Sequence, residues 1–171
     1  MIEKVNTGIS SNTNKRIIDL LFEVNTWSFG FEIFLSKNIN KSVAGMLYRS
    51  YMDESTYVGN DALNSYAFTI CDMVEKNSYL NFKKIKRVYW NWYFPGSSME
   101  FHHDDPKDNS YSIVYNLHNN DGGTDFKINN EVTFHKSIES EAILFPSKIY
   151  HRGIAPKKNL NRFSLNIMVE I

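Results

Sequence analysis

Apolar side chains in the first half of the chain recur at helical spacing in two segments. Residues 14–25 carry four of them, three or four positions apart: Ile17, Leu20, Leu21 and Val24. Residues 60–77 repeat the pattern over a longer stretch: Leu63, Tyr66, Ala67, Ile70 and Val74. This spacing places the apolar side chains of each segment on one face, which predicts two amphipathic helices. Asn60 or Asp61 can act as the N-cap of the second helix.

The period changes after residue 85, where short runs rich in β-branched and aromatic residues alternate with clusters of Gly, Asn and Pro. The runs predict strands and the clusters predict turns, among them Asn129-Asn130. The predicted strands are Arg87–Phe94, Glu100–Asp104, Ser110–Leu117, Thr124–Ile128, Ala142–Phe145 and Arg162–Val169. Two helices followed by many short strands predict an α+β fold, mainly β, with the helices on one face of a folded sheet. A double-sheet jelly roll fits this number of strands.

The segment between the two predicted helices has a weaker pattern. Residues 27–35 are aromatic and β-branched, which predicts another strand. Residues 36–60 show no clear period, so we expect a long loop there, and loops of this length often act as lids. Neither an internal repeat nor a shift in composition divides the chain. We therefore expect one domain over residues 1–171, with supporting helices and loops in residues 1–84 and the β core in residues 85–171.

Composition narrows the class of protein. The 171 residues are 42% hydrophobic and 15% aromatic, which suits one globular core with a lined pocket. The 19 basic and 19 acidic side chains balance, which argues against a dedicated nucleic-acid binder. Cys71 is the only cysteine, so no intrachain disulfide can form, and this fits a reducing cytoplasm. The first residues lack the apolar stretch of a signal peptide, and no run of about 18 apolar residues occurs. We expect a cytoplasmic protein that does not enter a membrane.

Three residues in the second half form a candidate metal site. His102 and Asp104 stand two apart in a predicted strand, so their side chains point the same way. His151 follows a later apolar run, far enough along the chain to reach the same point from another strand. Two histidines and one carboxylate are the ligands of a facial-triad iron(II) site, which leaves three coordination positions open. A fourth protein ligand would block those positions.

A second His-x-Asp triplet overlaps the first. His103 and Asp105 have the same spacing as His102 and Asp104. We prefer the earlier pair, because the Asp-Pro dipeptide that follows it is typical of a turn at the end of a strand. The competing pair stays open at the level of sequence.

An arginine and a hydroxyl follow the third candidate ligand. Arg162 and Ser164 share one face of the last predicted strand. A planar guanidinium makes two parallel charge-assisted hydrogen bonds to a carboxylate, and the serine can add a third. A buried arginine without such a partner would be costly. We therefore expect Arg162 and Ser164 to hold the far carboxylate of a dicarboxylate cosubstrate; the alternative is a structural ion pair between Arg162 and an acidic side chain.

The order His-x-Asp, His, Arg-x-Ser resembles the iron(II)- and 2-oxoglutarate-dependent dioxygenases. It is most similar to their prolyl-4-hydroxylase-like branch, in particular to the small single-domain forms that bacteriophages carry. The resemblance runs from about Tyr89 to Ile171. It implies a double-stranded β-helix, a cupin-like jelly roll with two supporting N-terminal helices. It also implies Fe(II) on His102, Asp104 and His151, with 2-oxoglutarate and O₂ as cosubstrates and ascorbate as a supporting reductant.

The resemblance implies further contacts to the cosubstrate. Tyrosines and amides at places like those of Tyr93, Tyr115 and Asn116 help to hold 2-oxoglutarate in related enzymes. Many relatives have a second tyrosine where this chain has Asn116, which is a departure from the pattern. The segment Asp121–Phe126 resembles the Gly-Gly hairpin of the family, whose glycines we expect to adopt positive φ in a turn.

The implied activity is hydroxylation of an unactivated C–H bond of a peptidyl, prolyl-like, or amino-acid substrate, with release of succinate and CO₂. The expected partners are a peptide or a small molecule, with no strong nucleic-acid signal and no membrane, in the host cytoplasm if a virus encodes the chain. Two alternatives remain. One is a nucleobase or small-metabolite hydroxylase of the same class, suggested by basic clusters and by Trp90 and Trp92. The other is a non-catalytic metal-binding jelly-roll module. Specificity lies on loops, which carry little readable signal.

Overall fold

The computed structural model describes residues 1–29, 45–53, 59–97, 99–158 and 161–171. The helices are α1 (Ser11–Glu23) and α2 (Asp61–Lys76). The strands are β1 (Glu3–Asn6), β2 (Ser28–Phe29), β3 (Gly45–Met52), β4 (Lys84–Tyr93), β5 (Ser110–Asn116), β6 (Gly123–Ile128), β7 (Glu131–Lys136), β8 (Glu141–Pro146), β9 (Tyr150–Ile154) and β10 (Arg162–Glu170).

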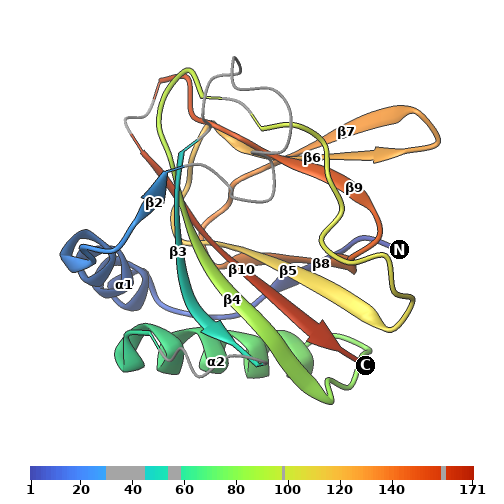
Figure 1. Cartoon of the computed structure of the whole chain (residues 1–171), viewed down its shortest axis with the longest axis horizontal. Coiled ribbons are helices and arrows are strands. Elements are labelled where there is room, and N and C mark those ends of the chain that lie inside the picture. The colour runs from blue at the N-terminus through green and yellow to red at the C-terminus, as the bar shows by residue number, and fades with distance from the viewer. Residues whose placement is uncertain (30–44, 54–58, 98, 159–160) are drawn as a thin grey trace.

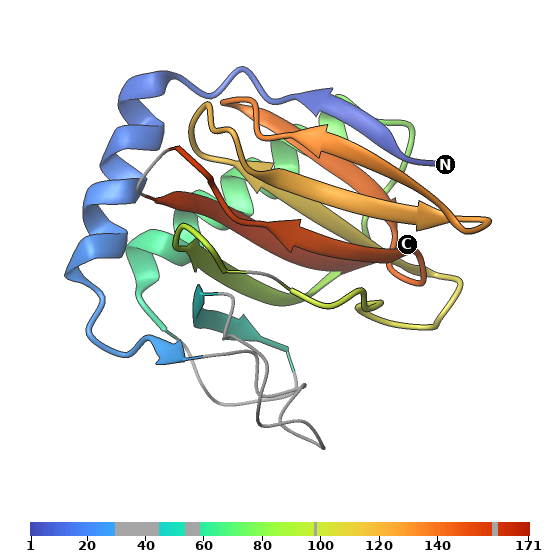
Figure 2. The ribbon, with the colours of Figure 1, turned by 90° about the horizontal axis from the view of Figure 1, so that it is seen from above.

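The described strands form two antiparallel sheets (Figure 1). The larger sheet has the order β1-β8-β5-β10-β4-β3-β2, and the smaller has the order β7-β6-β9. The chain crosses from one sheet to the other between β5 and β6, between β7 and β8, and on both sides of β9. This is the double-sheet jelly roll that the sequence predicted, and Figure 2 shows the sheets from above.

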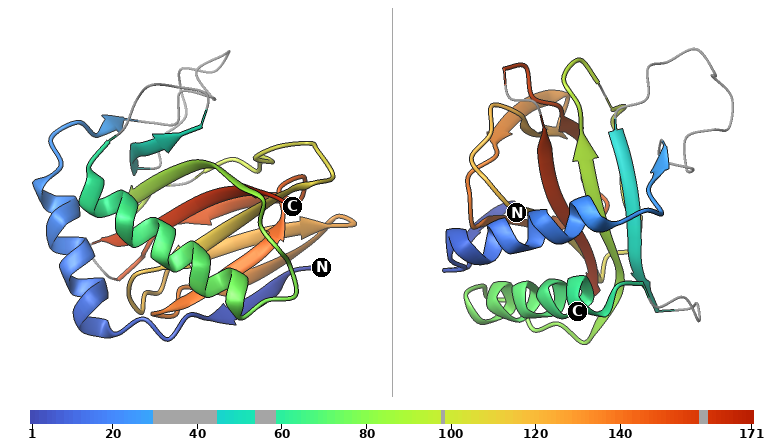
Figure 3. Two further views of the ribbon diagram at one scale, coloured as in Figure 1. Left: turned by 90° about the horizontal axis from the view of Figure 1, so that it is seen from below. Right: turned by 90° about the vertical axis from the view of Figure 1, so that its left-hand side faces the viewer.

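Both predicted helices are present. The first begins three residues earlier than predicted, because the Ser10 hydroxyl caps it by accepting a hydrogen bond from Thr13 N at 3.2 Å. The second has Asn60 as its N-cap, with Leu63 N donating to the side chain at 3.1 Å. Figure 3 shows the helices against the large sheet, with α2 crossing its strands on one face. In the described ranges, no helix is long and apolar enough to span a membrane.

The main hydrophobic core lies between the helices and the large sheet. The helices contribute one apolar face each, including Ile17, Leu20, Leu21, Leu63, Ala67, Ile70 and Val74. The sheet contributes Val88, Trp90, Ile113, Tyr115, Leu165 and Ile167. A smaller cluster of Val114, Phe126, Ile143 and Phe145 comes from strands of both sheets. This smaller cluster therefore joins the two sheets.

The prediction of an unbroken loop over residues 36–60 was wrong in part. Residues 45–52 form β3, a strand between β2 and β4. Its side chains do not alternate cleanly, because its pairing with β4 shifts between Arg49 and Tyr51 and both of its faces are partly covered. Of the predicted strand at residues 27–35, residues 28–29 are a strand, Trp27 is not part of it, and residues 30–35 lie outside the described residues. The predicted lid also lies mainly outside them.

Other strand predictions need correction. Residues 100–104 are not a strand, although His102 forms an isolated bridge with His151. Three further observed strands, besides β3, were missed: β1, β7 and β9. The strands β1 and β9 are short and carry no alternating apolar pattern. The strand β7 does alternate, with Val132 and Phe134 as its apolar positions, but both side chains are exposed at a sheet edge. The Asn129-Asn130 turn that joins β6 to β7 is present, with φ of 50° and 67°.

Candidate active site

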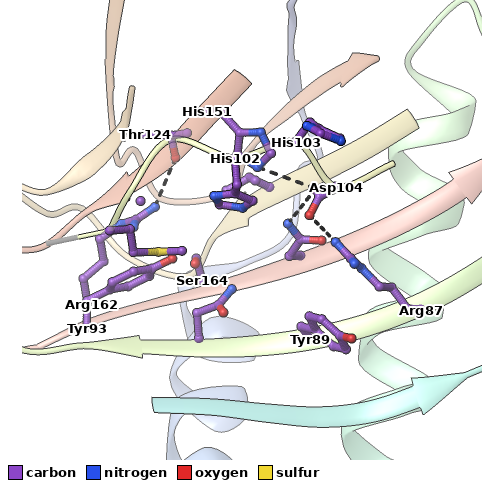
Figure 4. A pocket seen from close by; sticks show the side chains of 15 residues that line it. Arg87, Tyr89, Tyr93, His102, His103, Asp104, Thr124, His151, Arg162 and Ser164 are labelled. Carbon is purple, nitrogen blue, oxygen red and sulfur yellow. Dashed lines mark hydrogen bonds and ion pairs between the residues drawn. The ribbon is translucent and has the colours of Figure 1, made fainter. Parts of the chain in front are cut away.

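The strands β4 and β10 place alternate side chains in the space between the two sheets. Their antiparallel register pairs Arg162 with Tyr93 and Ser164 with Asn91. All four residues line one pocket (Figure 4). Since residues two apart share a face, the side chains between them point to the helices instead.

The structure brings the three candidate metal ligands to this pocket. One ligand atom from each of His102, Asp104 and His151 lies within 4.8 Å of the other two. Main-chain hydrogen bonds join the histidines, His102 N to His151 O at 3.0 Å and His151 N to His102 O at 2.8 Å. The two rings are consequently close, with centroids 4.5 Å apart. A strand was therefore not needed to align them.

Hydrogen bonds to the main chain orient the two imidazoles. His151 Nδ1 lies 2.9 Å from Ile149 O, and His102 Nδ1 lies 3.2 Å from Glu100 O. A proton on each Nδ1, donated to its carbonyl, makes Nε2 the basic nitrogen, as in metal-bound histidines. His151 Nε2 lies 3.5 Å from Asp104 Oδ2.

Three side chains hold the Asp104 carboxylate. Ser112 Oγ donates to Oδ2 at 2.6 Å, and Asn166 Nδ2 donates to Oδ2 at 3.4 Å. The Arg87 guanidinium forms an ion pair with Oδ1. The sequence did not predict that these three residues belong to the site. Asn166 could have been found, because it shares one face of β10 with Arg162 and Ser164. Arg87 and Ser112 lie on β4 and β5, and no local pattern links them to Asp104.

The electrostatics of the site suit a divalent cation. Burial would raise the pKa of Asp104, but Arg87 in particular, then His151, His102 and Ser112, lower it well below its ordinary value. Burial, with a smaller contribution from His151, lowers the pKa of His102 to about 4, against the opposing effect of Asp104. At neutral pH the site thus offers an ionised carboxylate and a neutral imidazole, the protonation states that bind metal.

Arg162 is a fully buried cation whose guanidinium faces the pocket. Its Nη2 lies 3.5 Å from Thr124 Oγ1, and its Nε and Nη1 have no hydrogen-bond partner among the residues that the structure describes. The Tyr93 ring lies under it, with the centroid 4.7 Å from Cζ. Among the described residues no carboxylate pairs with it, which disfavours the alternative of a structural ion pair. Two unpartnered donors on a buried cation fit the carboxylate of a bound dicarboxylate.

The Tyr93 ring packs directly against Gly153 on the opposite sheet, where only a glycine leaves room for it. A Cβ atom at Gly153 would lie 2.6 Å from Tyr93 Cζ, so a larger residue would displace the ring. Burial raises the pKa of Tyr93, and Arg162 and Ser164 partly offset this rise. Gly122 likewise admits the Arg162 side chain, because its Cβ would lie 3.0 Å from Cδ. The expected positive φ of Gly122 and Gly123 was wrong, since neither adopts it; space is the physical requirement at Gly122.

Two of the expected cosubstrate residues lie elsewhere. Tyr115 points toward the helices, where its hydroxyl donates to Asn14 Oδ1 at 2.6 Å. Asn116 is buried, and its side-chain amide makes two hydrogen bonds within the protein. It accepts from Ser137 Oγ at 2.9 Å and donates to Glu141 O at 3.2 Å. Neither lines the pocket. The registers of β5 were not readable from the sequence, because both of its faces are buried.

The competing His-x-Asp pair lies outside the cluster of candidate metal ligands. The His103 ring packs against Tyr150, with centroids 5.4 Å apart. Asp105 Oδ1 accepts a hydrogen bond from Lys107 N at 3.1 Å, in the turn that the sequence predicted. Within the described residues, the one cluster with metal-ligand geometry is the set of His102, Asp104 and His151.

No protein-family model and no curated protein matches the sequence. Solved structures match the fold. A prolyl-4-hydroxylase from Pseudomonas putida has a TM-score of 0.71 at 10% identity, over 99% of this chain and 92% of that one. A prolyl hydroxylase from Trichoplax adhaerens was solved in complex with a hypoxia inducible factor oxygen degradation domain peptide fragment. Its TM-score is 0.71 at 14% sequence identity, and the match covers 99% of this chain and 83% of that one. The epimerase SnoN in complex with Fe³⁺, alpha ketoglutarate and nogalamycin RO has a TM-score of 0.70 at 9% sequence identity. That match covers 99% of this chain and 78% of SnoN.

The chain therefore has the jelly-roll fold of the 2-oxoglutarate- and iron(II)-dependent oxygenases. Prolyl hydroxylases are among the matching structures, as the resemblance to that branch predicted. At such low identity the likeness establishes the fold, and the chemistry has to be argued from this chain's own residues.

Proposed function

We propose that this protein is an Fe(II)- and 2-oxoglutarate-dependent dioxygenase that hydroxylates an unactivated C–H bond. His102, Asp104 and His151 hold the metal, and Arg162 with Ser164 holds the 5-carboxylate of 2-oxoglutarate. Residues 1–171 form a single oxygenase domain in this proposal. The proposal rests mainly on one observation: the buried guanidinium of Arg162 has no carboxylate partner among the described residues and lies in the same pocket as a His-Asp-His cluster.

Different residues of the pocket bind the metal and the cosubstrate in this proposal. The imidazoles of His102 and His151 and the carboxylate of Asp104 would hold the metal, since they meet in the pocket from the segment around His102 and from β9. Iron(II) at this position supplies oxygen activation coupled to decarboxylation of 2-oxoglutarate. Arg162 orients the cosubstrate from the far end of the pocket, and the Tyr93 ring limits where its carbon chain can lie. The polar wall of β4 and β10 faces the space that remains.

A peptidyl, prolyl-like, or amino-acid substrate is the first candidate. The Trichoplax prolyl hydroxylase, which shares the fold, binds a peptide fragment. A small metabolite is the second candidate, because SnoN shares the fold equally well and binds nogalamycin RO. Succinate release over panels of peptides, free amino acids and small metabolites would separate the two. Turnover by no member of any panel would contradict both.

The first experiment is a spectroscopic test of the class. Metal-free protein receives iron(II) and then 2-oxoglutarate without oxygen, and the visible spectrum is recorded. We expect a weak charge-transfer band that requires both additions, because 2-oxoglutarate chelates the metal through its 1-carboxylate and 2-oxo group. His151→Ala should abolish the band. His135→Ala is the matched control, since His135 packs on the same Phe126 ring but stands outside the cluster.

The outcomes of this experiment are distinct. A band that persists in His151→Ala would contradict the metal assignment. No band in the wild-type protein, with metal bound and the fold intact, would favour a non-catalytic metal-binding module. His103→Ala tests the competing register, and we expect the band to remain.

A further inference from the structure

We propose that Arg87 is a positioning residue for the metal site, which holds Asp104 so that one carboxylate oxygen faces the two histidines. This inference rests on the proposed function, because it assumes that Asp104 is a metal ligand. Arg87 lies on β4, 17 residues before Asp104. Its ion pair and ring contact within the described residues are to Asp104 and Tyr89, so its role is separate from that of Arg162.

The two oxygens of Asp104 have different environments. Arg87 Nη2 forms an ion pair with Oδ1, whereas Oδ2 lies 3.5 Å from His151 Nε2. Ser112 and Asn166 also donate to Oδ2, from the side of the large sheet. The guanidinium therefore takes the oxygen that points away from His151. A carboxylate held in this way cannot rotate without breaking a buried ion pair.

The surroundings of Arg87 fix its own position. The Arg87 and Asp104 side chains are 9% and 5% exposed, so water competes little for the ion pair. The Arg87 guanidinium lies over the Tyr89 ring, with Cζ 4.7 Å from the centroid. Within the described part of the chain its Nε has no hydrogen-bond partner. Asp104 and Tyr89 are thus the main contacts that hold the arginine, and a planar cation suits both of them.

Positioning and plain electrostatics make opposite predictions for metal binding. A cation beside a divalent ion repels it, so removal of Arg87 would tighten metal binding if charge alone mattered. If Arg87 orders the ligand, its removal frees Asp104 and weakens metal binding. Loss of partners that orient metal ligands typically costs 10–100-fold in affinity. The sign of the change in affinity therefore decides the role.

The experiment measures Mn(II) binding to the metal-free full chain by calorimetry, without 2-oxoglutarate, and compares Arg87→Met with the wild type. We expect the dissociation constant to rise by roughly 10–100-fold. The visible spectrum of the Co(II)-substituted protein should change as well, because it reports the geometry of the ligands. Arg49→Met is the matched control, since Arg49 packs on the same Tyr89 ring from β3. We expect it to bind Mn(II) within about two-fold of the wild type.

Unchanged or tighter Mn(II) binding in Arg87→Met, with an unchanged Co(II) spectrum, would overturn the inference. If Arg87→Met does not fold, Arg87→Lys decides instead, because it keeps the cation but not the planar guanidinium. Weaker binding than wild type in the lysine variant supports positioning, and equal binding overturns it. A wild-type protein that binds no Mn(II) would contradict the proposed function itself, so the two failures are distinguishable.

Discussion

The two sides of β4 and β10 in the large sheet differ in chemistry. Along β10, Phe163, Leu165 and Ile167 belong to the main hydrophobic core, whereas the residues between them line the pocket. The strand β4 repeats this division, with Val88 and Trp90 in the core and alternate residues in the pocket. Both faces of these two strands are largely buried, yet the helix side is apolar and the pocket side carries mostly polar residues.

The difference shows how the fold separates stability from chemistry. The apolar face is covered by α1 and α2, and its burial stabilises the fold. The polar face carries two buried arginines, and one of them has no counter-charge. Such groups cost free energy in the absence of a ligand. We therefore expect substitutions on the two faces to have opposite effects on stability and binding.

The largest effect is expected at the metal site itself. His102→Ala removes one of three ligands, so 2-oxoglutarate turnover, measured as succinate release, should be abolished. The free energy of unfolding of the metal-free protein should change little. Turnover comparable to that of the wild type would remove His102 from the site.

The next largest effect concerns Arg162. Arg162→Leu removes a charge-assisted contact to the cosubstrate, which costs at least about 2 kcal/mol, or roughly 30-fold in the dissociation constant of 2-oxoglutarate. It also removes a buried cation without a counter-charge, so the metal-free protein should be equally or more stable in urea. Lower stability together with unchanged 2-oxoglutarate affinity would reverse the assignment and make Arg162 structural.

The matching substitution on the helix-facing side is Leu165→Ala. Leu165 is fully buried, and the lost contacts and the cavity should cost about 2–5 kcal/mol of unfolding free energy, measured in urea. At temperatures where the variant is folded, its dissociation constant for 2-oxoglutarate should stay within about two-fold of the wild-type value. A large loss of affinity with little loss of stability would break the separation of the two faces.

The pH dependence of stability offers a further test. The unfolded chain protonates His102 near its ordinary pKa of 6.5, whereas the folded protein does so only at about 4, because of burial and then His151. The unfolded state thus binds more protons between these values, so the metal-free protein loses stability as the pH falls from 6.5 toward 4. The contribution is on the order of 1–3 kcal/mol. Urea unfolding at several pH values should show a flatter profile in His102→Ala.

The smallest effect is expected for Tyr115→Phe. This change removes one buried hydrogen bond, to Asn14, and should cost about 1 kcal/mol of unfolding free energy. The affinity for 2-oxoglutarate should not change, because the tyrosine faces the helices. A clear loss of that affinity, measured by anaerobic titration, would return Tyr115 to the cosubstrate site.

Much of the site was readable from the sequence because its residues follow local rules. His102 and Asp104 needed only extended backbone, and Arg162 and Ser164 needed only the period of a strand. The partners Arg87 and Ser112 were not readable, since they approach Asp104 through pairing of β4 and β5 with β10. The strand β9, which carries His151, was missed because it is short and lacks an alternating apolar pattern.

By itself the sequence determined the two helices, the β-rich second half, and the order of the candidate metal ligands and the candidate carboxylate anchor along the chain. Spacing and apolar period determine these features, and both act over a few residues. Only the tertiary structure decided which face each side chain occupies when both faces of a strand are buried. It placed Tyr93 in the pocket and Tyr115 against a helix, left Arg162 without a counter-charge, and brought Arg87 to Asp104. The physical reason is that strand register and the packing of the two sheets depend on residues far apart in the chain.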